Sequence, residues 1–470
     1  MTPVEDLLRE GKATLSDDGL LPAFVFNNPD VHRLELERVF ARAWNFIGHE
    51  TEIPSPGDYV LRYIGRDPFI FVRDEGGEVR ILFDSCRHRG TQVCRAEKGN
   101  ASHFRCSYHG WTYKNNGQLV GAPGFREGYG GGRFERRDWG LLPAPKVASV
   151  HGLYFASLDA DAPSLDEYLG DMRWYLDLLF GLSDDGMEVV GEPHRWIMRG
   201  NWKNAADQFC GDDYHTLFLH KSMWEVGVIQ IPAQANMMGY HVQAGNGHAL
   251  SFSMAPNPDD PGPKYLGYPE EVVEKFTSTT LTDEQRELAR RARVMVGTVF
   301  PNFGFLALPL TADPKVPPTA MFTIQQFRPV APDQVEMWAW YLVWKGIPPE
   351  LKEASYRAAM GNFSSSGIFE QDDAEPFQSI ARAAGGEFAR KAGMQFNYQM
   401  GLEGVGSAAV ASDFPGPGVA YWPRFEEGNQ RALYGRWLDY MTSSDYPASV
   451  PPPDLARSTN GAGGAVAAKR

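Results

Sequence analysis

Two short segments of the chain each offer one cysteine and one histidine as possible metal ligands, in the same order. Cys86 and His88 form the first pair, and Cys106 and His109 form the second. A Rieske [2Fe–2S] centre needs this set of donors, because two thiolates hold one iron and two imidazoles hold the other. A zinc ion on the same residues is the alternative, but zinc sites usually pair Cys with Cys and His with His. The alternation therefore favours a Rieske cluster.

A second group of possible ligands lies further along the chain. His215 and His220, with one distant carboxylate, match the facial triad of non-haem Fe(II) oxygenases, which leaves coordination positions open. This spacing would separate the two side chains by about 140° on a straight helix. The helix is therefore expected either to end between them or to contain a π-bulge. Glu370, Asp372 and Asp373 are all candidates for the carboxylate, and spacing does not choose among them.

Together these motifs resemble the large (alpha) subunit of the Rieske non-haem iron aromatic-ring-hydroxylating dioxygenases. The resemblance rests first on the two Cys/His pairs. It rests further on Asn-Trp-Lys at 201–203, on Gly-Asp-x-x-His at 211–215 with His220, and on Glu-x-Asp-Asp at 370–373. The motifs follow in the family's order and cover nearly the whole chain.

The resemblance implies one Rieske cluster on the four Cys and His residues and one mononuclear iron on His215, His220 and Asp373. Asp372 is the second choice for the carboxylate. Asp212 is implied to be catalytic, because the corresponding residue links an iron-ligating histidine to a cluster-ligating histidine of the neighbouring subunit. A trimer of alpha subunits, with or without a small beta subunit, is therefore expected.

The reaction implied by the resemblance is the O2- and electron-dependent cis-dihydroxylation of an aromatic ring. Electrons would come from NAD(P)H through a reductase and a ferredoxin. The chain has no dinucleotide-binding fingerprint, so these electron-transfer activities are expected on separate proteins.

The family's substrate pocket maps onto residues that are mostly apolar, none of them basic. They are Gln208, Phe209, Leu217, Phe300, Asn302, Phe363 and Phe369. This lining predicts a mono- or polycyclic aromatic hydrocarbon, because a carboxylated ring would need Arg or Lys as a partner. An aromatic acid such as phthalate is the alternative substrate.

Two other functional classes are kept open at this point. An iron–sulfur electron carrier would need only the cluster, and would leave the His215, His220 and Asp373 motif unexplained. A zinc-stabilised protein that binds hydrophobic ligands would differ from both in lacking the colour of a Rieske cluster.

Composition limits the partners and the compartment. The chain has 470 residues, 22% charged and 43% hydrophobic, as in a soluble protein of two domains. Its net charge of −14 argues against nucleic acid or an anionic membrane as partner. The sequence contains neither an apolar run long enough for a membrane span nor a signal peptide at its start. We therefore expect a cytoplasmic protein.

Hydrophobic patterning predicts an α+β chain with a small all-β domain before a larger mixed domain. The expected parts are an N-terminal helical segment over 1–42, the Rieske domain over 43–158, the catalytic domain over 159–445 and a flexible tail over 446–470. The resemblance implies that the catalytic domain is an antiparallel sheet covered by helices, of the helix-grip, START-like type, with the N-terminal segment packed on it.

Local patterns predict individual elements. A helix should begin at Asn28 and Pro29 and present an apolar face as far as Trp44, and another helix is expected over 165–182. Strands are expected at 59–64, 68–72, 79–83, 322–328 and 335–343, and a hairpin turn at 115–117.

Overall fold

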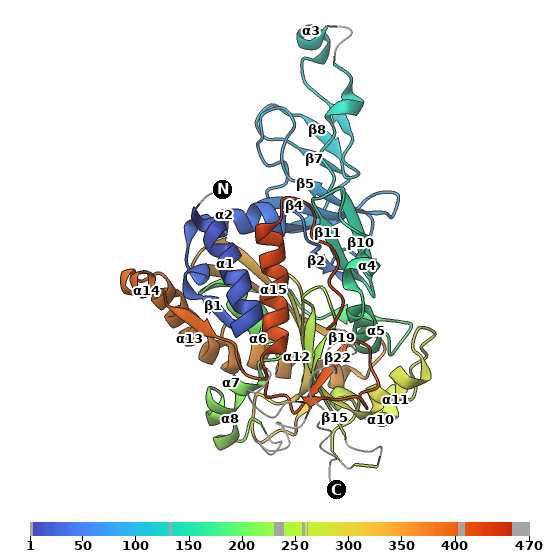
Figure 1. Cartoon of the computed structure of the whole chain (residues 1–470). Coiled ribbons are helices and arrows are strands. Elements are labelled where there is room, and N and C mark those ends of the chain that lie inside the picture. Colours follow the sequence, from blue (N-terminus) through green and yellow to red (C-terminus); the bar gives the residue numbers. More distant parts are fainter. Residues whose placement is uncertain are drawn as a thin grey trace.

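The computed structural model of the chain describes residues 3–130, 134–229, 239–255, 259–260, 262–402 and 409–453. Figure 1 shows a large body of sheet and helices, from which a smaller β-rich part drawn in blue to cyan extends. Buried side chains form one large apolar cluster, which fills the body and extends to residues of the smaller part such as Phe71. A separate small cluster includes Cys86, Cys106, Trp111 and Tyr113. The smaller part therefore has a small core of its own and also contributes side chains to the large core of the body.

The smaller part contains two antiparallel sheets, with strand orders β5-β4-β3-β6 and β7-β8-β9. Their strands are β3 (Asp58–Ile64), β4 (Asp67–Arg73), β5 (Val79–Phe83), β6 (Lys98–Asn100), β7 (His103–Arg105), β8 (Thr112–Lys114) and β9 (Leu119–Gly121). The three strands predicted here are β3, β4 and β5, and the predicted hairpin turn joins β8 to β9. The local prediction is confirmed for this part.

A three-stranded sheet with the order β10-β11-β2 contacts the body. Its strands are β2 (Asn45–His49), β10 (Lys146–Val150) and β11 (Leu153–Ser157). Phe46 on β2 packs against Phe303 and Trp340 of the body, with ring centroids 4.7 and 5.2 Å apart. These aromatic contacts fasten the three-stranded sheet to the body.

The body is built on a ten-stranded antiparallel sheet with the order β12-β19-β18-β17-β16-β15-β14-β22-β21, in which β13 also pairs with β19. The strands are β12 (Met187–Val189), β13 (His194–Arg199), β14 (Tyr240–Gln243), β15 (Ala249–Met254), β16 (Ala292–Val299), β17 (Phe303–Leu310), β18 (Thr319–Ala331), β19 (Gln334–Trp344), β21 (Ala409–Val410) and β22 (Val419–Trp422). The two long strands predicted from alternation lie inside β18 and β19, which pair with each other.

The helices are α1 (Pro3–Asp18), α2 (Pro29–Glu35), α3 (Phe125–Tyr129), α4 (Leu165–Leu169), α5 (Met172–Phe180), α6 (Trp202–Phe209), α7 (Asp213–Phe218), α8 (Lys221–Glu225), α10 (Glu270–Val273), α11 (Asp283–Arg291), α12 (Pro349–Phe363), α13 (Ile368–Ala384), α14 (Glu387–Ala392) and α15 (Gly428–Thr442). Short helical turns and a small sheet complete the fold: η1 (Ala23–Phe26), η2 (Leu36–Phe40), η3 (Glu50–Glu52), η4 (Arg136–Trp139), η5 (Tyr265–Gly267), and β1 (Leu20–Pro22) paired with β20 (Gln395–Asn397).

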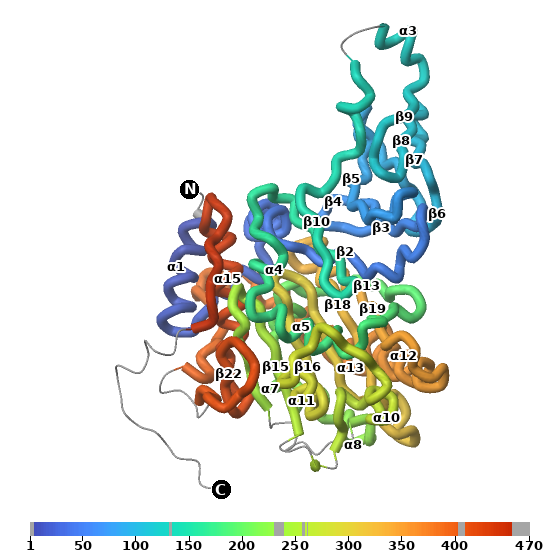
Figure 2. Tube along the Cα trace, turned by 90° about the vertical axis from the view of Figure 1, so that its right-hand side faces the viewer, coloured from blue at the N-terminus to red at the C-terminus, as the bar shows by residue number. Residues whose placement is uncertain are grey.

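Helices cover the large sheet, as the resemblance implied. α6 packs on β16, β17 and β18, α12 packs on β18 and β19, and α15 packs on β14 and β15. Figures 1 and 2 both show α1 beside α15, so the N-terminal helix lies on the catalytic body. None of the helices in the described ranges combines the length and apolar character needed to cross a membrane.

Three local expectations need correction. The helix that begins at Asn28 changes to a π-helical turn and ends at Phe40, before Trp44, although Trp44 is buried as expected. The helix expected over 165–182 is two helices, α4 and α5, because Gly170 at φ +51° interrupts it. The expected tail is held to the body at its start, where the Val450 N–H donates to Asn246 at 2.7 Å. Residues 454–470 of the tail lie outside the described residues.

Candidate metal centres and substrate cavity

The two Cys/His segments form matching loops, one after β5 and one between β7 and β8. In each loop the N–H of a glycine four residues after the cysteine donates to the cysteine carbonyl. Gly90 donates to Cys86 at 2.8 Å, and Gly110 donates to Cys106 at 3.0 Å. Both glycines have positive φ, +77° and +74°, a conformation that glycine adopts without steric cost. The same turn therefore presents both pairs of ligands.

The four side chains are arranged as an inner and an outer pair. Both cysteines are 2% exposed, whereas His88 and His109 are half-buried. The two Nδ1 atoms of the histidines are 3.1 Å apart. Among the described residues, the possible metal-binding atoms that lie within 4.8 Å of one another belong to His215, His220 and Asp373, not to these four residues. The four side chains therefore do not surround a single ion, as a zinc site requires. Two thiolates on one side and two imidazoles on the other fit a two-iron cluster.

A tight turn positions the second pair of histidines. Gly211, at φ +108°, reverses the chain after α6, and α7 then begins with Asp212 as its N-cap. A Cβ on Gly211 would lie 2.7 Å from the Cβ of Ser251, so β15 leaves no room for a side chain there. The helix ends between His215 and His220, which is the first of the two predicted solutions. Their ring centroids are 5.1 Å apart.

His215, His220 and Asp373 converge, with one ligand atom from each lying within 4.8 Å of the others. Oδ1 of Asp373 lies 3.9 Å from Nε2 of His215 and 3.4 Å from Nε2 of His220. This oxygen is buried and accepts no hydrogen bond from the described residues. A bound cation would compensate such an oxygen. The three residues therefore fit a mononuclear iron of the facial-triad type.

The neighbouring carboxylate points to another nitrogen. Oδ2 of Asp372 lies 3.2 Å from Nδ1 of His220, while Nε2 of the same ring faces Asp373. Ligating histidines commonly donate their second ring N–H to a carboxylate, which fixes the tautomer and the ring orientation. The geometry thus favours Asp373 as the ligand and Asp372 as the group that orients His220.

Asp212 contacts both the backbone and the ring of His215. Its Oδ1 accepts the His215 N–H at 3.2 Å, and its Oδ2 lies 3.4 Å from Nδ1 of the ring. Burial acts to raise the pKa of Asp212, but the His215 ring and N–H outweigh it and hold the pKa below its usual range. The side chain is a carboxylate that remains 38% exposed.

An apolar cavity of about 110 Å³ adjoins the triad, between the large sheet and helices α6, α7, α12 and α13. The rings of Phe363 and Phe369, which stack 5.2 Å apart, form one wall. The cavity is lined by Ala205, Gln208, Phe209, Asp212, Asp213, His215, Thr216, His220, Val294, Val296, Leu306, Leu308, Leu310, Met337, Phe363, Phe369, Glu370, Asp373 and Phe377.

Four of the seven predicted pocket residues line this cavity, namely Gln208, Phe209, Phe363 and Phe369. The amide nitrogen of Gln208 lies 3.0 Å from Nε2 of His215. Gln208 therefore borders the proposed metal position as well as the cavity.

The other three predicted pocket residues are not among the described residues that line the cavity. Phe300 stacks on Tyr440 at 5.4 Å, and it is six residues beyond Val294, about 20 Å along the strand direction. Asn302 lies next to β17, where its carbonyl accepts the Phe327 N–H at 3.0 Å. Leu217 is half-buried on α7, about 100° around the helix from the cavity-lining Thr216. Their place in the substrate pocket therefore stays a prediction.

The lining that the sequence interpretation missed comes mostly from two strands. Val294 and Val296 lie on β16, and Leu306, Leu308 and Leu310 lie on β17. Their spacing of two places each set on one face of its strand. Alternation was therefore the available signal, although the sequence does not say which face meets the triad.

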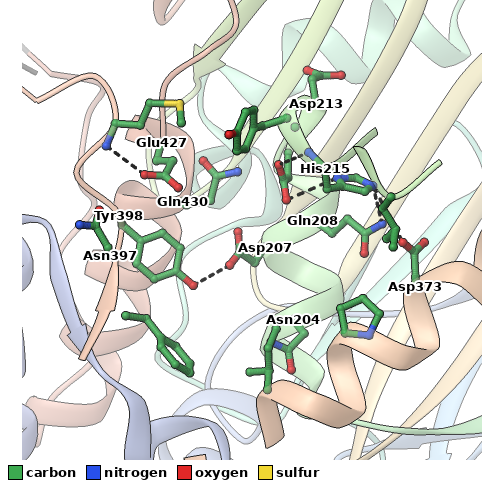
Figure 3. A pocket seen from close by; sticks show the side chains of 18 of the residues that line it. Asn204, Asp207, Gln208, Asp213, His215, Asp373, Asn397, Tyr398, Glu427 and Gln430 are labelled. Carbon is green, nitrogen blue, oxygen red and sulfur yellow. Dashed lines mark hydrogen bonds and ion pairs between the residues drawn. The ribbon is translucent and has the colours of Figure 1, made fainter. Parts of the chain in front are cut away.

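A larger cavity of about 780 Å³, whose lining includes several charged and amide side chains, reaches the triad from another direction, between α7, α13, β20 and α15. Figure 3 shows Asp207 in this space with its carboxylate toward Tyr398. The hydroxyls of Tyr398 and Tyr434 donate to Oδ2 of Asp207 at 2.9 and 2.7 Å. Burial raises the pKa of Asp207 to about 7, and the charge of Asp212 adds to the effect. The triad thus lies between two cavities.

Comparison with known proteins agrees with this arrangement. Residues 43–141 match the model of the Rieske [2Fe-2S] domain, and residues 165–443 match the model of the ring hydroxylating alpha subunit (catalytic domain). The chain therefore belongs to the ring-hydroxylating oxygenase alpha subunits.

Individual relatives cover almost the whole chain. It is 37% identical to the N,N-dimethyl phenylurea N-demethylase subunit alpha of Sphingobium sp. (strain YBL2), over 91% of this chain and 92% of that one. It is 35% identical to the biphenyl 2,3-dioxygenase subunit alpha of Rhodococcus jostii (strain RHA1), over 92% and 90%. The structure of naphthalene 1,2-dioxygenase from Rhodococcus sp. bound to indole matches with a TM-score of 0.90 and 44% identity, covering 95% of this chain and 100% of that chain.

These findings confirm the predicted family, fold class and reaction class. The protein is a terminal oxygenase alpha subunit, an oxidoreductase that incorporates both atoms of O2 into an aromatic ring. The family carries a Rieske cluster and a mononuclear iron. An electron carrier or a ligand-binding protein without oxygen chemistry does not account for the matched catalytic domain.

Proposed function

We propose that the substrate of this oxygenase is an uncharged aromatic compound of one or two rings. The observation that supports this most directly is the apolar cavity beside the triad, in which no described lining residue is Arg or Lys. A ring bearing a carboxylate would meet the carboxyl groups of Glu370 and Asp373 there without a cationic partner. An aromatic acid is therefore the less favoured substrate.

The size of the cavity favours the smaller of the proposed aromatic substrates. Its volume of about 110 Å³ is of the same order as an engineered apolar cavity of about 150 Å³ that binds benzene. Larger polycyclic substrates would require Phe363 or Phe369 to move. The similarity to biphenyl and naphthalene dioxygenases supports aromatic hydrocarbons as the class.

We further propose the ligand sets of the two metal centres. Cys86, Cys106, His88 and His109 would hold the [2Fe–2S] cluster, and His215, His220 and Asp373 would hold the iron. When bound, the iron supplies the activation of dioxygen and the cluster supplies electrons. Overall, one aromatic ring, one O2, two electrons and two protons give one cis-dihydrodiol.

The chain's own residues orient the reactants. Asp372 holds the His220 ring through Nδ1, so Nε2 faces the metal position. The stacked rings of Phe363 and Phe369 confine the substrate against that position, and the aliphatic strand residues exclude water. Confinement by packing, rather than by a bond to the metal, then determines which ring carbons react.

Electron transfer is proposed to cross between subunits. In Figure 1, β7 and β8, which flank the second cluster loop, lie in the upper part of the molecule, whereas α7 and α8 lie near the bottom. Asp212 is a partly exposed carboxylate that contacts the ring of His215, which suits a bridge to a cluster histidine of a neighbouring alpha subunit. This proposal includes an alpha trimer, a possible small beta subunit, and a ferredoxin and an NAD(P)H-dependent reductase as donors, in the cytoplasm.

The test is turnover of a panel of aromatic compounds by the iron-loaded protein with a surrogate ferredoxin and reductase. Toluene, naphthalene and biphenyl should give cis-dihydrodiols, with the smaller rings preferred, whereas phthalate should give none. Oxidation of phthalate alone would contradict the proposed substrate class. N,N-dimethyl phenylurea belongs in the panel because one relative is named for its N-demethylation.

A further inference from the structure

The apolar cavity contains a buried carboxyl group that the proposed reaction does not use. Glu370 lines the cavity, is 5% exposed, and precedes Asp373 by three residues on α13. Its Oε1 accepts a hydrogen bond from Nε2 of Gln325 at 2.6 Å. Among the described residues, the Glu370 carboxyl group has no second hydrogen-bond partner. Its other oxygen, Oε2, is therefore available to a ligand in the cavity.

The surroundings of this group favour its uncharged form. The cavity wall around it consists of side chains such as Leu308, Met337, Phe363 and Phe369, and an isolated charge in such a place is strongly disfavoured. Burial raises the pKa of Glu370 to about 8, and the charge of Asp373 adds to the effect, against the opposing hydrogen bond from Gln325. A neutral carboxyl group has one O–H donor.

The hydrogen bond from Gln325 determines which oxygen of the Glu370 carboxyl group carries the proton. Because Oε1 accepts the Gln325 N–H, Oε1 is the carbonyl oxygen of the acid and the proton belongs on Oε2. An O–H group without an acceptor in an apolar cavity costs free energy, and a ligand that accepts its hydrogen bond regains it.

We propose that Glu370 donates a hydrogen bond to an acceptor oxygen of the substrate, so that the oxygenase takes aromatic rings bearing a carbonyl next to the ring, such as aryl ketones and aromatic carboxamides. This inference rests on the proposed function and narrows its substrate class. It makes Glu370 a specificity-determining residue.

The position of Glu370 relative to the triad is consistent with such an anchor. Three residues correspond to a rise of about 4.5 Å along a helix, so Glu370 and Asp373 lie about one turn apart on the same side of α13. A carbonyl held at Glu370 would leave the ring beside Phe363 and Phe369, facing the metal position.

The test uses two compounds of nearly the same shape, acetophenone and α-methylstyrene, which differ by a carbonyl oxygen in place of a methylene group. For the iron-loaded protein we would measure the ratio of their kcat/KM values in direct competition and the ratio of their Kd values by calorimetry. The wild type should prefer acetophenone in both measurements. One hydrogen bond corresponds to a preference of about tenfold.

Substitutions at Glu370 separate the effect of its hydrogen-bond donor from the effect of the size of its side chain. Glu370→Gln keeps an acceptor for Gln325 and an N–H donor for the substrate, and should retain the preference within about threefold. Glu370→Met removes the donor and should abolish it. Because Glu370→Met leaves Gln325 unpaired, the double variant with Gln325→Met is the second form to test if the single variant fails to fold. Met337→Leu is the control, an apolar change in the same lining that should leave the ratio unaltered.

Two results would overturn the inference. The first is an unchanged ratio in Glu370→Met and in the double variant. The second is loss of the preference in Gln208→Met with Glu370→Met unaffected, which would make Gln208 the polar contact. The proposed function fails separately, if neither compound nor any hydrocarbon is dihydroxylated although the Kd ratio depends on Glu370 as expected.

Discussion

Nδ1 of His220 lies 3.2 Å from Oδ2 of Asp372, and Nε2 on the other side of the same ring lies 3.4 Å from Oδ1 of Asp373. The two adjacent carboxylates therefore contact opposite nitrogens of one imidazole. One can share a metal ion with His220, and the other can hold the ring in the tautomer that this requires.

This relationship predicts different metal contents for two neighbouring variants. Asp373→Ala should lose the mononuclear iron and all activity, because one of three ligands is removed. Asp372→Ala should still bind iron, with affinity reduced by about 10- to 100-fold. Iron content per subunit, corrected for cluster iron from the visible spectrum, checks both. Retention of mononuclear iron in Asp373→Ala together with its loss in Asp372→Ala would reverse the assignment.

The cluster ligands can be tested by replacing an imidazole that binds iron with a thiolate. His88→Cys or His109→Cys should lower the reduction potential or lose the cluster, because thiolate donates more charge than neutral imidazole. Visible and EPR spectra with a redox titration measure this. The exposed His103 on β7 provides the control, since His103→Ala should leave the spectra unaltered. Wild-type spectra in both Cys variants are incompatible with the proposed ligands.

Asp212→Asn tests the path between subunits. The variant keeps the shape of the side chain but lacks its charge and cannot accept hydrogen bonds at both positions. We expect both metal centres to remain, the cluster to be reduced normally by ferredoxin, and steady-state turnover to collapse. Single-turnover experiments on pre-reduced, iron-loaded protein provide the measurement.

A purely orienting role for Asp212 makes a different prediction, because Asp212 also caps α7 and contacts the His215 ring. In that case Asp212→Asn should lose iron. Rapid cluster oxidation with product formation in the variant would exclude Asp212 from the electron path.

The stacked pair Phe363 and Phe369 should control where the ring is oxidised. Shrinking either side chain to Val enlarges the cavity on one side and lets the ring shift relative to the metal position. Product isomer ratios from naphthalene and biphenyl should change while iron content stays constant. Phe300→Val is the matched control, because Phe300 packs on Tyr440 away from the cavity. Equal isomer ratios in all three variants would remove Phe363 and Phe369 from substrate positioning.

A buried histidine behind α7 predicts a pH dependence of stability. His241 lies 3.2 Å from Asp213 and 3.1 Å from Glu426. Burial lowers its pKa, but the two carboxylates outweigh this and raise it to about 9. The pKa of a histidine in the unfolded chain is about 6.5. The contribution of protonated His241 to the free energy of unfolding is therefore complete below that pH and is lost as the pH rises through about 9.

His241→Gln should therefore lower the Tm at pH 6.5 and remove most of the wild-type decline between pH 6.5 and 9.5, a difference on the order of 2–3 kcal/mol. Burial lowers the pKa of His248 to about 3, so it is neutral throughout this range. His248→Gln should consequently keep the slope. A slope in His241→Gln equal to that of the wild type would contradict the assignment of charge to His241.

The sequence alone determined the chemistry of this protein, because its ligand types are rare and their order is informative. Two alternating Cys/His pairs and a His215, His220 and carboxylate motif leave few alternatives, and the catalytic-domain and Rieske-domain matches confirm the family. The strands β3, β4, β5, β18 and β19 were also predictable, since alternation of apolar side chains is a local property.

Only the tertiary structure decided which residues meet at the site. Val294 and Leu308 approach the triad from strands far away in sequence. Phe300, which directly follows the strand of Val294, instead stacks on Tyr440. The choice between Asp372 and Asp373 likewise depends on how α13 is rotated against His220. Such contacts arise from long-range packing, in which many side chains together fix the position of each element, and no local pattern in the chain records that outcome.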